Sequence, residues 1–183
     1  MSDKKPFVIA SITLGCIGAV SAALIGITNL VTRDTIKENE IKKINAGIVE
    51  IFGENASISA KQTNKEAGLK EAYTYVNTVY TVKDNSDNQL GYAFRTDGSN
   101  MYGKLSLIIG FDEVSKNFKK FSIVVNEQTY AGTLVENYVI PVNNGDIDYD
   151  ADESVKCGAT YGATTIREMI REASIAAKEI WKE

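Results

Sequence analysis

The stretch FVIASITLGCIGAVSAALIGITNLV, residues 7–31, contains no charged side chain. A helix needs about 20 consecutive apolar residues to cross the hydrocarbon core of a bilayer, so this stretch is long enough to span one. Its glycines are in keeping with that role, because glycine is common in membrane-spanning helices. The sequence therefore predicts a single transmembrane helix over residues 7–31.

The flanks of this helix indicate its orientation. Residues 1–6 form a short tail that contains Lys4 and Lys5, and the basic residues Arg33 and Lys37 follow the span. Because the two sides carry equal numbers of basic residues, the positive-inside rule gives little preference. The brevity of the tail favours a signal anchor with a cytoplasmic N-terminus and an extracytoplasmic C-terminal domain.

Two other interpretations of the N-terminus compete with the anchor. A cleaved signal peptide has an apolar region of about 7–15 residues that ends at a small-residue site, whereas this region is longer and continues without a break. Leu14-Gly15-Cys16 weakly resembles a lipoprotein cleavage box, but the apolar run continues as far as Val31. We therefore interpret Cys16 as a small apolar residue that faces lipid or a neighbouring helix.

Composition excludes several classes of function. The 183 residues include no histidine, which excludes imidazole metal sites and the catalytic mechanisms that depend on histidine. The net charge is −4, and without a basic stripe the sequence argues against nucleic-acid binding. Cys16 and Cys157 lie far apart and do not make a disulfide framework.

Helical and strand patterns alternate beyond the span. Isoleucines at mostly helical spacing predict a juxtamembrane helix over residues 32–53, which Gly53 ends. Residues 54–70 are polar and weakly patterned. Alternating β-branched and aromatic residues predict strands that are separated by turns at residues 83–88 and 97–100. The predicted strands cover residues 73–82, 90–96, 104–111 and 118–126.

The C-terminal part combines an acidic stretch with a helix. Residues 127–156 are expected to be mostly irregular, and their aspartates lack the spacing of an EF-hand, so a solvated acidic loop is favoured over a calcium site. An amphipathic helix is predicted from Thr164 to Trp181. The order of elements predicts an α+β fold, in which a transmembrane helix precedes a domain, residues 54–183, with a central antiparallel sheet flanked by helices.

A tandem Gly-Ala-Thr, residues 158–160 and 162–164, lies where this last helix begins. A helix N-terminus has unpaired N–H groups and partial positive charge, and it binds phosphate readily. Glycine and alanine let such a group approach the backbone, and threonine either caps the helix or accepts a phosphoester. Taken alone, the motif is better explained as a simple helix start with a capping hydroxyl.

The motif and its surroundings resemble the FMN-binding domain family. This family includes the G subunit of Rnf-type ion-translocating ferredoxin:NAD oxidoreductases and the C subunit of sodium-translocating NADH:quinone oxidoreductases. Its motif is commonly Asp-x-x-Ser/Thr-Gly-Ala-Thr, and a flavin transferase esterifies the FMN phosphate to the last threonine. Similar segments run in the family's order along nearly the whole chain, at residues 27–36, 38–40, 91–94, 102–112 and 121–129.

Two registers of the family motif fit this chain. In the first, Thr160 is the acceptor of covalent FMN, Cys157 replaces the usual serine or threonine, and Ser154 replaces the aspartate. In the second, Thr164 is the acceptor and Tyr161 occupies the serine position. Cysteine is nearly isosteric with serine, and the first register also aligns the apolar residues of the following helix with those of the family. We therefore prefer Thr160.

The resemblance also implies which residues surround the cofactor. Gly158 and Ala159 receive the phosphate, and Tyr102 and Tyr130 are candidate stacking rings, although residues 130–132 depart from the family's Pro-Gly-Leu. The other residues that the resemblance places near the flavin are Glu127, Gln128, Thr129, Tyr161 and Thr164. Because the isoalloxazine ring supplies the electron chemistry, no catalytic side chain and no metal ligand is assigned.

The implied function is that of a redox subunit in a membrane Rnf-type complex, not of a catalyst on its own. Its partners are the membrane subunits of that complex and a flavin transferase. Gly18, Ala22 and Gly26 recur every fourth residue, which permits close packing against another membrane helix. Two alternatives stay open: a stand-alone membrane-anchored surface flavoprotein, and a flavin-free binding or structural module with the same fold.

Overall fold

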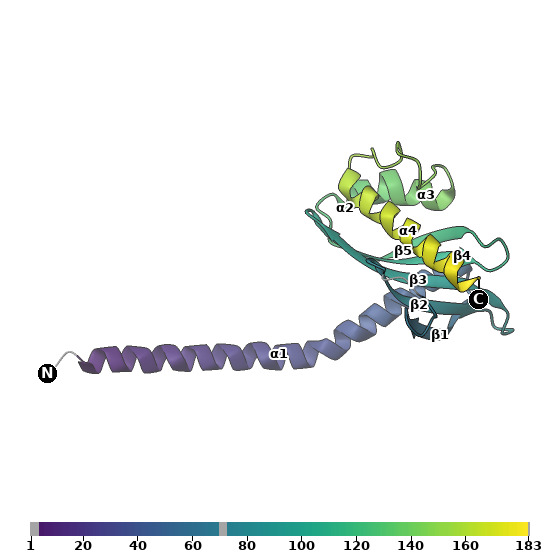
Figure 1. The fold of residues 1–183 in the computed structure, drawn as a ribbon. Coiled ribbons are helices and arrows are strands. Elements are labelled where there is room, and N and C mark those ends of the chain that lie inside the picture. Colours follow the sequence, from purple (N-terminus) through teal and green to yellow (C-terminus); the bar gives the residue numbers. More distant parts are fainter. Residues whose placement is uncertain (1–3, 70–72, 183) are drawn as a thin grey trace. The chain divides into compact units, whose positions relative to one another are not determined.

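The computed structural model describes residues 4–69 and 73–182, whose elements are labelled in Figure 1. The chain divides into two compact units, Met1–Lys42 and Lys43–Glu183. Helix α1 (Lys4–Phe52) makes up the described part of the first unit and continues into the second. The predicted cytoplasmic tail, residues 1–6, falls partly outside the description, since residues 1–3 are not among the described residues and Lys4 is already helical.

The N-terminal part of α1 has the properties of a membrane anchor. By length and composition it is apolar enough to cross a bilayer, and its most apolar window has a mean hydropathy of 2.3 and no buried residue. Leu14 and Ile25 are 72% and 71% exposed, as expected of a helix whose solvent is lipid. The predicted end of the helix is confirmed, because Phe52 is its last residue and Gly53 follows in the left-handed region at φ +103°.

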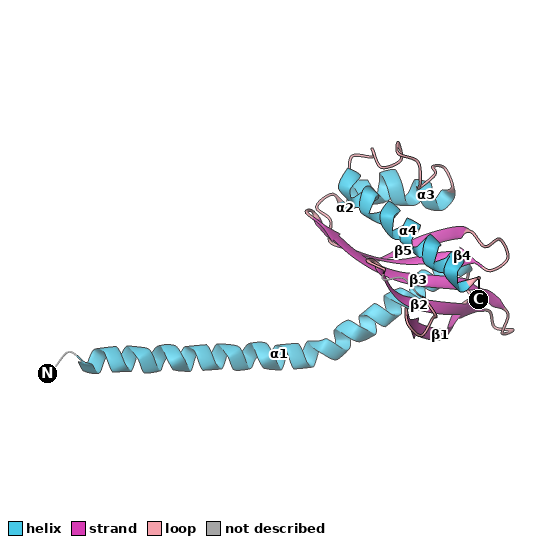
Figure 2. Cartoon of the chain, viewed as in Figure 1, coloured by secondary structure: helices cyan, strands magenta, loops and turns pink. Residues whose placement is uncertain are grey.

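A five-stranded antiparallel sheet forms the centre of the second unit (Figure 2). The strands lie side by side in chain order, and each is antiparallel to the next. They are β1 (Ser57–Thr63), β2 (Val76–Lys83), β3 (Gln89–Asn100), β4 (Gly103–Asp112) and β5 (Phe118–Asn126). The predicted α+β class with a central antiparallel sheet is confirmed.

Strands β3 and β1 differ from the sequence prediction. Residues 97–100 were predicted to turn, but they continue β3 and pair with residues 103–106 of β4, so the turn lies at residues 100–103. The edge strand β1 falls in the weakly patterned stretch 54–70. It pairs only with β2, and its side chains are exposed or half-buried, so no strong apolar alternation marks it.

Residues 73–75, predicted to begin a strand, precede β2 instead. The N–H groups of Thr74 and Tyr75 donate to the Glu172 carboxylate, at 3.0 and 2.6 Å, and Val76 donates to the same group at 2.8 Å. This carboxylate binds the backbone ahead of the first residue of β2 that pairs with β1, Thr78, while Val76 already pairs with Thr96 of β3.

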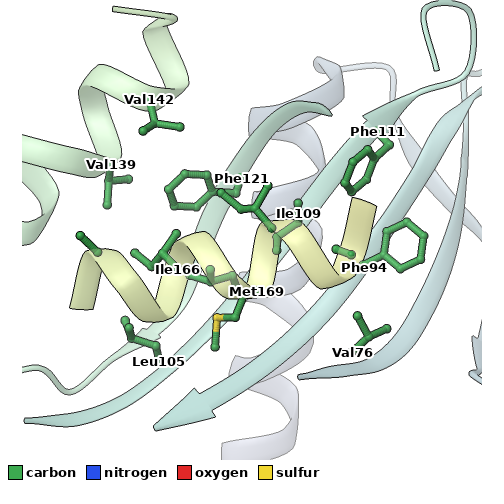
Figure 3. Close-up of a cluster of buried hydrophobic side chains, with 14 of the residues drawn as sticks. Val76, Phe94, Leu105, Ile109, Phe111, Phe121, Val139, Val142, Ile166 and Met169 are labelled. Atoms are coloured by element: carbon green, nitrogen blue, oxygen red, sulfur yellow. The ribbon is translucent and has the colours of Figure 1, made fainter. Parts of the chain in front are cut away.

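Helices cover both faces of the sheet. Because successive side chains of a strand point to opposite faces, neighbouring residues of β3 belong to different clusters. On one face, Ile44, Ile48 and Ile51 of α1 pack in a cluster with Ala93 and other strand residues. On the other face, α4 (Thr160–Ile180) packs in a larger cluster that includes the next residue of β3, Phe94. Figure 3 shows part of this second cluster; the labelled residues are Val76, Phe94, Leu105, Ile109, Phe111, Phe121, Val139, Val142, Ile166 and Met169.

The segment from residue 127 to 156 is more ordered than predicted. It contains α2 (Ala131–Leu134), the π-helical turn η1 (Val135–Val139) and α3 (Ile140–Asn144), which follow one another without a break. Apolar residues at positions 134, 135, 138, 139 and 142 recur at helical spacing, a signal that the prediction missed. The acidic loop that follows is not simply solvated, because Asp150 pairs with Arg171 of α4 and Asp152 lies 2.9 Å from Arg167. These ion pairs attach the loop to α4.

Candidate functional site

A pocket of about 230 Å³ lies at the N-terminal end of α4. Three parts of the chain build it: the turn between β3 and β4, the segment around α2, and the start of α4. The residues that line it are Tyr102, Gln128, Tyr130, Leu134, Gly158, Ala159, Thr160, Tyr161 and Gly162. All of them belong to the second unit.

The start of α4 presents backbone donors rather than a capped end. The helix begins at Thr160, four residues before the predicted start at Thr164. Its N-cap is Ala159, and no side chain caps it, so the interpretation of threonine as the capping residue is wrong. The N–H of Ala163 donates to the Ala159 carbonyl at 3.1 Å, and the N–H groups before it have no partner further back in the helix. Such a terminus attracts an anion.

Two glycines allow this arrangement. Gly158 has φ +85°, a conformation that glycine adopts without steric cost. Gly162 faces Leu134, and a Cβ on Gly162 would lie 2.8 Å from Leu134 Cδ2. Because Leu134 is fully buried and lines the pocket, a larger residue at 162 would disturb the pocket wall.

Three tyrosine rings meet at the pocket. The centroid of the Tyr102 ring lies 5.8 Å from that of Tyr130 and 5.3 Å from that of Tyr161. Tyr130 and Tyr161 are 53% and 55% exposed, whereas Tyr102 is half-buried between them. A site of this kind suits a planar aromatic group, because rings pack favourably at these separations.

The segment after β5 supports one wall of the pocket. Gln128 is 7% exposed, and its Nε2 donates to the Gly103 carbonyl at 2.6 Å. The N–H of Thr129 donates to the Tyr102 carbonyl at 3.0 Å, and its hydroxyl donates to the same oxygen at 3.3 Å. Glu127 is exposed, and its N–H donates to the Lys104 carbonyl at 2.9 Å.

The predicted site residues fall into two groups. Those that line the common pocket are Tyr102, Gln128, Tyr130, Gly158, Ala159, Thr160 and Tyr161. The pocket lining does not include Cys157, Thr164, Glu127 or Thr129, which are their neighbours along the chain or one helical turn away. Cys157 is a half-buried free thiol whose carbonyl accepts a hydrogen bond from Asn137 at 3.0 Å.

Leu134 and Gly162 also line the pocket but were not among the predicted site residues. Leu134 lies in the helical run of residues 131–144 and shares a face with the buried residues Tyr138 and Val142, four and eight residues further on. This spacing marks it as a core residue but not as part of a site. Gly162 does have a sequence signal, because it begins the second Gly-Ala-Thr repeat. Both Gly-Ala-Thr repeats thus belong to the start of α4. The first repeat ends at the first residue of the helix, and the second begins with the glycine that packs against Leu134.

The comparison with known families bears on the N-terminal part of the chain. Residues 1–51 match the model of the RnfG N-terminal region. The N-terminal region is of the RnfG type. Over these residues the match confirms the predicted resemblance to the G subunit, and it suggests a subunit of an Rnf complex. A search of curated proteins finds no match to the chain.

Proposed function

We propose that this RnfG-type chain is the electron-transfer subunit of a membrane Rnf-type ion-translocating ferredoxin:NAD oxidoreductase, with FMN joined through its phosphate to Thr160. The single observation that supports this most is the pocket at the start of α4. There the exposed Thr160 lies at an uncapped helix N-terminus, beside three tyrosine rings.

The chemistry of the pocket residues fits such a group. The first N–H groups of α4 are suited to a phosphate, and Gly158 and Ala159 have no bulky side chain to obstruct it. The tyrosine rings are suited to an isoalloxazine. Ligand pockets usually measure about 300–1,000 Å³, so a pocket of about 230 Å³ leaves part of the ring system outside. Partial exposure is compatible with electron exchange with partner subunits.

The environments of the two threonines favour Thr160 as the acceptor. Thr160 is exposed, is the first residue of α4 and lines the pocket. Thr164 is half-buried, lies about one turn further along the helix and does not line the pocket. An ester on Thr160 therefore needs no rearrangement of α4.

In this mechanism the isoalloxazine supplies the electron chemistry when FMN is bound. The Thr160 Oγ1 is the ester oxygen, and the N–H groups of the first turn of α4 stabilise the negative charge of the phosphodiester. Tyr102, Tyr130 and Tyr161 would hold the ring system, and Gln128, which donates to the Gly103 carbonyl, supports one wall of the pocket. The covalent bond retains the cofactor on a domain from which a dissociated flavin would be lost.

The proposal includes the topology predicted from the sequence. Residues 1–6 are cytoplasmic, residues 7–31 cross the membrane, residues 32–53 form the juxtamembrane helix, and residues 54–183 form an extracytoplasmic FMN-binding domain. The candidate transmembrane helix supports membrane anchoring. The partners are the membrane subunits of the complex and the flavin transferase that attaches FMN.

Peptide mass mapping of residues 154–171 from native membranes tests the proposal. We expect a mass increase equal to FMN less water on Thr160, its loss in Thr160→Ala, and its retention in the matched control Thr164→Ala. Retention in Thr160→Ala together with loss in Thr164→Ala would move the acceptor to Thr164. Unmodified threonines in wild-type protein would refute covalent FMN, and failure to co-purify with membrane subunits would refute the place in the complex.

A further inference from the structure

Asn100, the last residue of β3, joins the β3–β4 turn to the start of α4. Its side-chain Nδ2 donates to the Thr165 hydroxyl at 3.0 Å and to the Tyr161 carbonyl at 3.3 Å. Its Oδ1 accepts from the N–H of Tyr102 at 2.9 Å. One half-buried amide thus links the two tyrosines that lie 5.3 Å apart in the pocket.

The chemistry of these partners fixes which way the amide points. The Tyr161 carbonyl can only accept a hydrogen bond, and the Tyr102 N–H can only donate one. A flipped Asn100 would place its oxygen against the carbonyl and its NH₂ group against the N–H. The Thr165 hydroxyl donates to the Tyr161 carbonyl at 2.9 Å, so it is available to Asn100 as an acceptor. An asparagine in this one orientation satisfies all three partners.

Tyr102 is therefore held at both ends of its backbone. Its N–H donates to Asn100, and its carbonyl accepts from the N–H and the hydroxyl of Thr129. Of these contacts, those of Asn100 extend to α4, whereas those of Thr129 fix the turn to the segment after β5. The Asn100 amide therefore connects the backbone of Tyr102 to the first turn of α4.

We infer that Asn100 is a positioning residue that sets the distance between Tyr102 and the first turn of α4, and thereby the geometry in which the tyrosine rings meet the flavin. The part that concerns flavin rests on the proposed function. The part that concerns the ring geometry does not, because the hydrogen bonds lie within the chain itself.

An isosteric substitution isolates this role. Asn100→Asp keeps the size of the side chain but replaces its two N–H donors with a carboxylate oxygen that faces the Tyr161 carbonyl. Like partial charges then oppose each other at the contact, and the turn separates from α4. Asn85→Asp is the matched control, because it makes the same chemical change at an exposed position in the β2–β3 turn, where the amide donates only to Asn55 at 3.3 Å.

The experiment uses the full-length protein, isolated from its own membranes in detergent, with three measurements. Mass spectrometry counts covalent flavin, the fluorescence of attached flavin reports its contact with the tyrosine rings, and NMR of flavin-free protein reports the nuclear Overhauser contact between the Tyr102 and Tyr161 rings. In Asn100→Asp we expect loss of the Tyr102–Tyr161 contact and brighter flavin fluorescence. In Asn85→Asp we expect both to stay as in the wild type.

Each outcome decides the inference. If Asn100→Asp retains both the ring contact and the wild-type fluorescence, Asn100 is not a positioning residue. If wild-type protein has no covalent flavin, the proposed function fails while the ring contact still tests Asn100. If Asn100→Asp does not fold, Thr165→Val decides, because it removes one acceptor while keeping the side-chain shape. We expect a weakened ring contact in that variant, and an unchanged one would overturn the inference.

Discussion

The two faces of the sheet are covered in different ways. On the first, the last turns of α1 contribute Ile44, Ile48 and Ile51 to a small cluster. On the second, α4 and the short helices η1 and α3 build a larger cluster with the strands, and the pocket lies at the N-terminal end of α4. The candidate site therefore lies on the face with the larger cluster, whereas the last turns of α1 pack on the face with the smaller one.

Truncation of α1 should have the largest effect, because it removes the helix that covers one face of the sheet. We expect a chain that begins at Lys43 to fold, and one that begins at Gly53 to lose its cooperative unfolding transition. The second chain lacks three buried isoleucines, each stabilising the fold by about 1.5–3 kcal/mol, which is a large part of a typical domain stability of about 5–15 kcal/mol. Thermal unfolding followed by circular dichroism measures both. Equal midpoints would mean that the α1 face is dispensable.

Replacing one buried isoleucine on each face compares how much the two clusters contribute to stability. Ile166→Ala on the α4 face and Ile48→Ala on the α1 face should each lower the free energy of unfolding by about 2–5 kcal/mol, since both side chains are fully buried. We expect the α4 variant to be the more costly because its cluster is larger. Urea titration measures these changes. The control is Ile175→Ala on the same helix, where the side chain is 53% exposed and the free energy of unfolding should change by no more than about 0.5 kcal/mol.

A carboxylate adds polar support to the α4 face. Glu172 accepts hydrogen bonds from the N–H groups of residues 74–76, so Glu172→Gln, which keeps only one acceptor oxygen, should cost about 1–3 kcal/mol. Glu168→Gln is the control, because that half-buried carboxylate pairs with the side chains of Arg167 and Arg171. Chemical denaturation measures the stability of both variants. Equal values would mean that the hydrogen bonds to Glu172 contribute no more to stability than the ion pairs of Glu168.

The smallest expected effect concerns pH. Burial raises the pKa of Glu113, but hydrogen bonds from Lys116, Trp181 and Gln89 outweigh it, so this pKa lies below its ordinary value. The stabilisation is therefore present above about pH 4.3, the usual value for glutamate, and is lost as pH falls through the lowered folded-state value. Glu113→Gln should lower stability by about 1 kcal/mol or less at pH 7, with no difference from wild type at strongly acidic pH.

Trp181 provides the readout for this prediction, because it is the chain's single tryptophan and donates to Glu113 at 3.2 Å. Unfolding followed by its fluorescence at neutral and acidic pH measures the effect. A constant difference between variant and wild type across that range would contradict the predicted pH dependence.

Much of the sheet was predictable because side-chain alternation is a local signal. The prediction for β5 matches the structure, and that for β4 differs by one residue at each end. By contrast, β1 is a half-exposed edge strand, and residues 97–100 contain turn-forming side chains that pairing with β4 overrides. Tertiary pairing, which a local pattern does not contain, decided these segments.

The candidate site was predictable in its chemistry but less so in its geometry. The tandem motif correctly marked the start of the last helix, yet Thr160–Ala163 already belong to α4. Threonine, tyrosine and glycine have low helix propensity, so the local sequence does not favour a helix here. The packing of Gly162 against Leu134 stabilises this first turn instead. Asn100 is distant in sequence from the motif, and only the folded chain brings it to α4.

The pairing of strands in chain order has a consequence for biosynthesis. Neighbouring hairpins close through local contacts, so the sheet can assemble as the polypeptide emerges from the ribosome. Helix α4 is made last and acquires a surface to rest on only when the sheet is complete. The pocket at the start of this helix therefore forms after the sheet on which the helix packs.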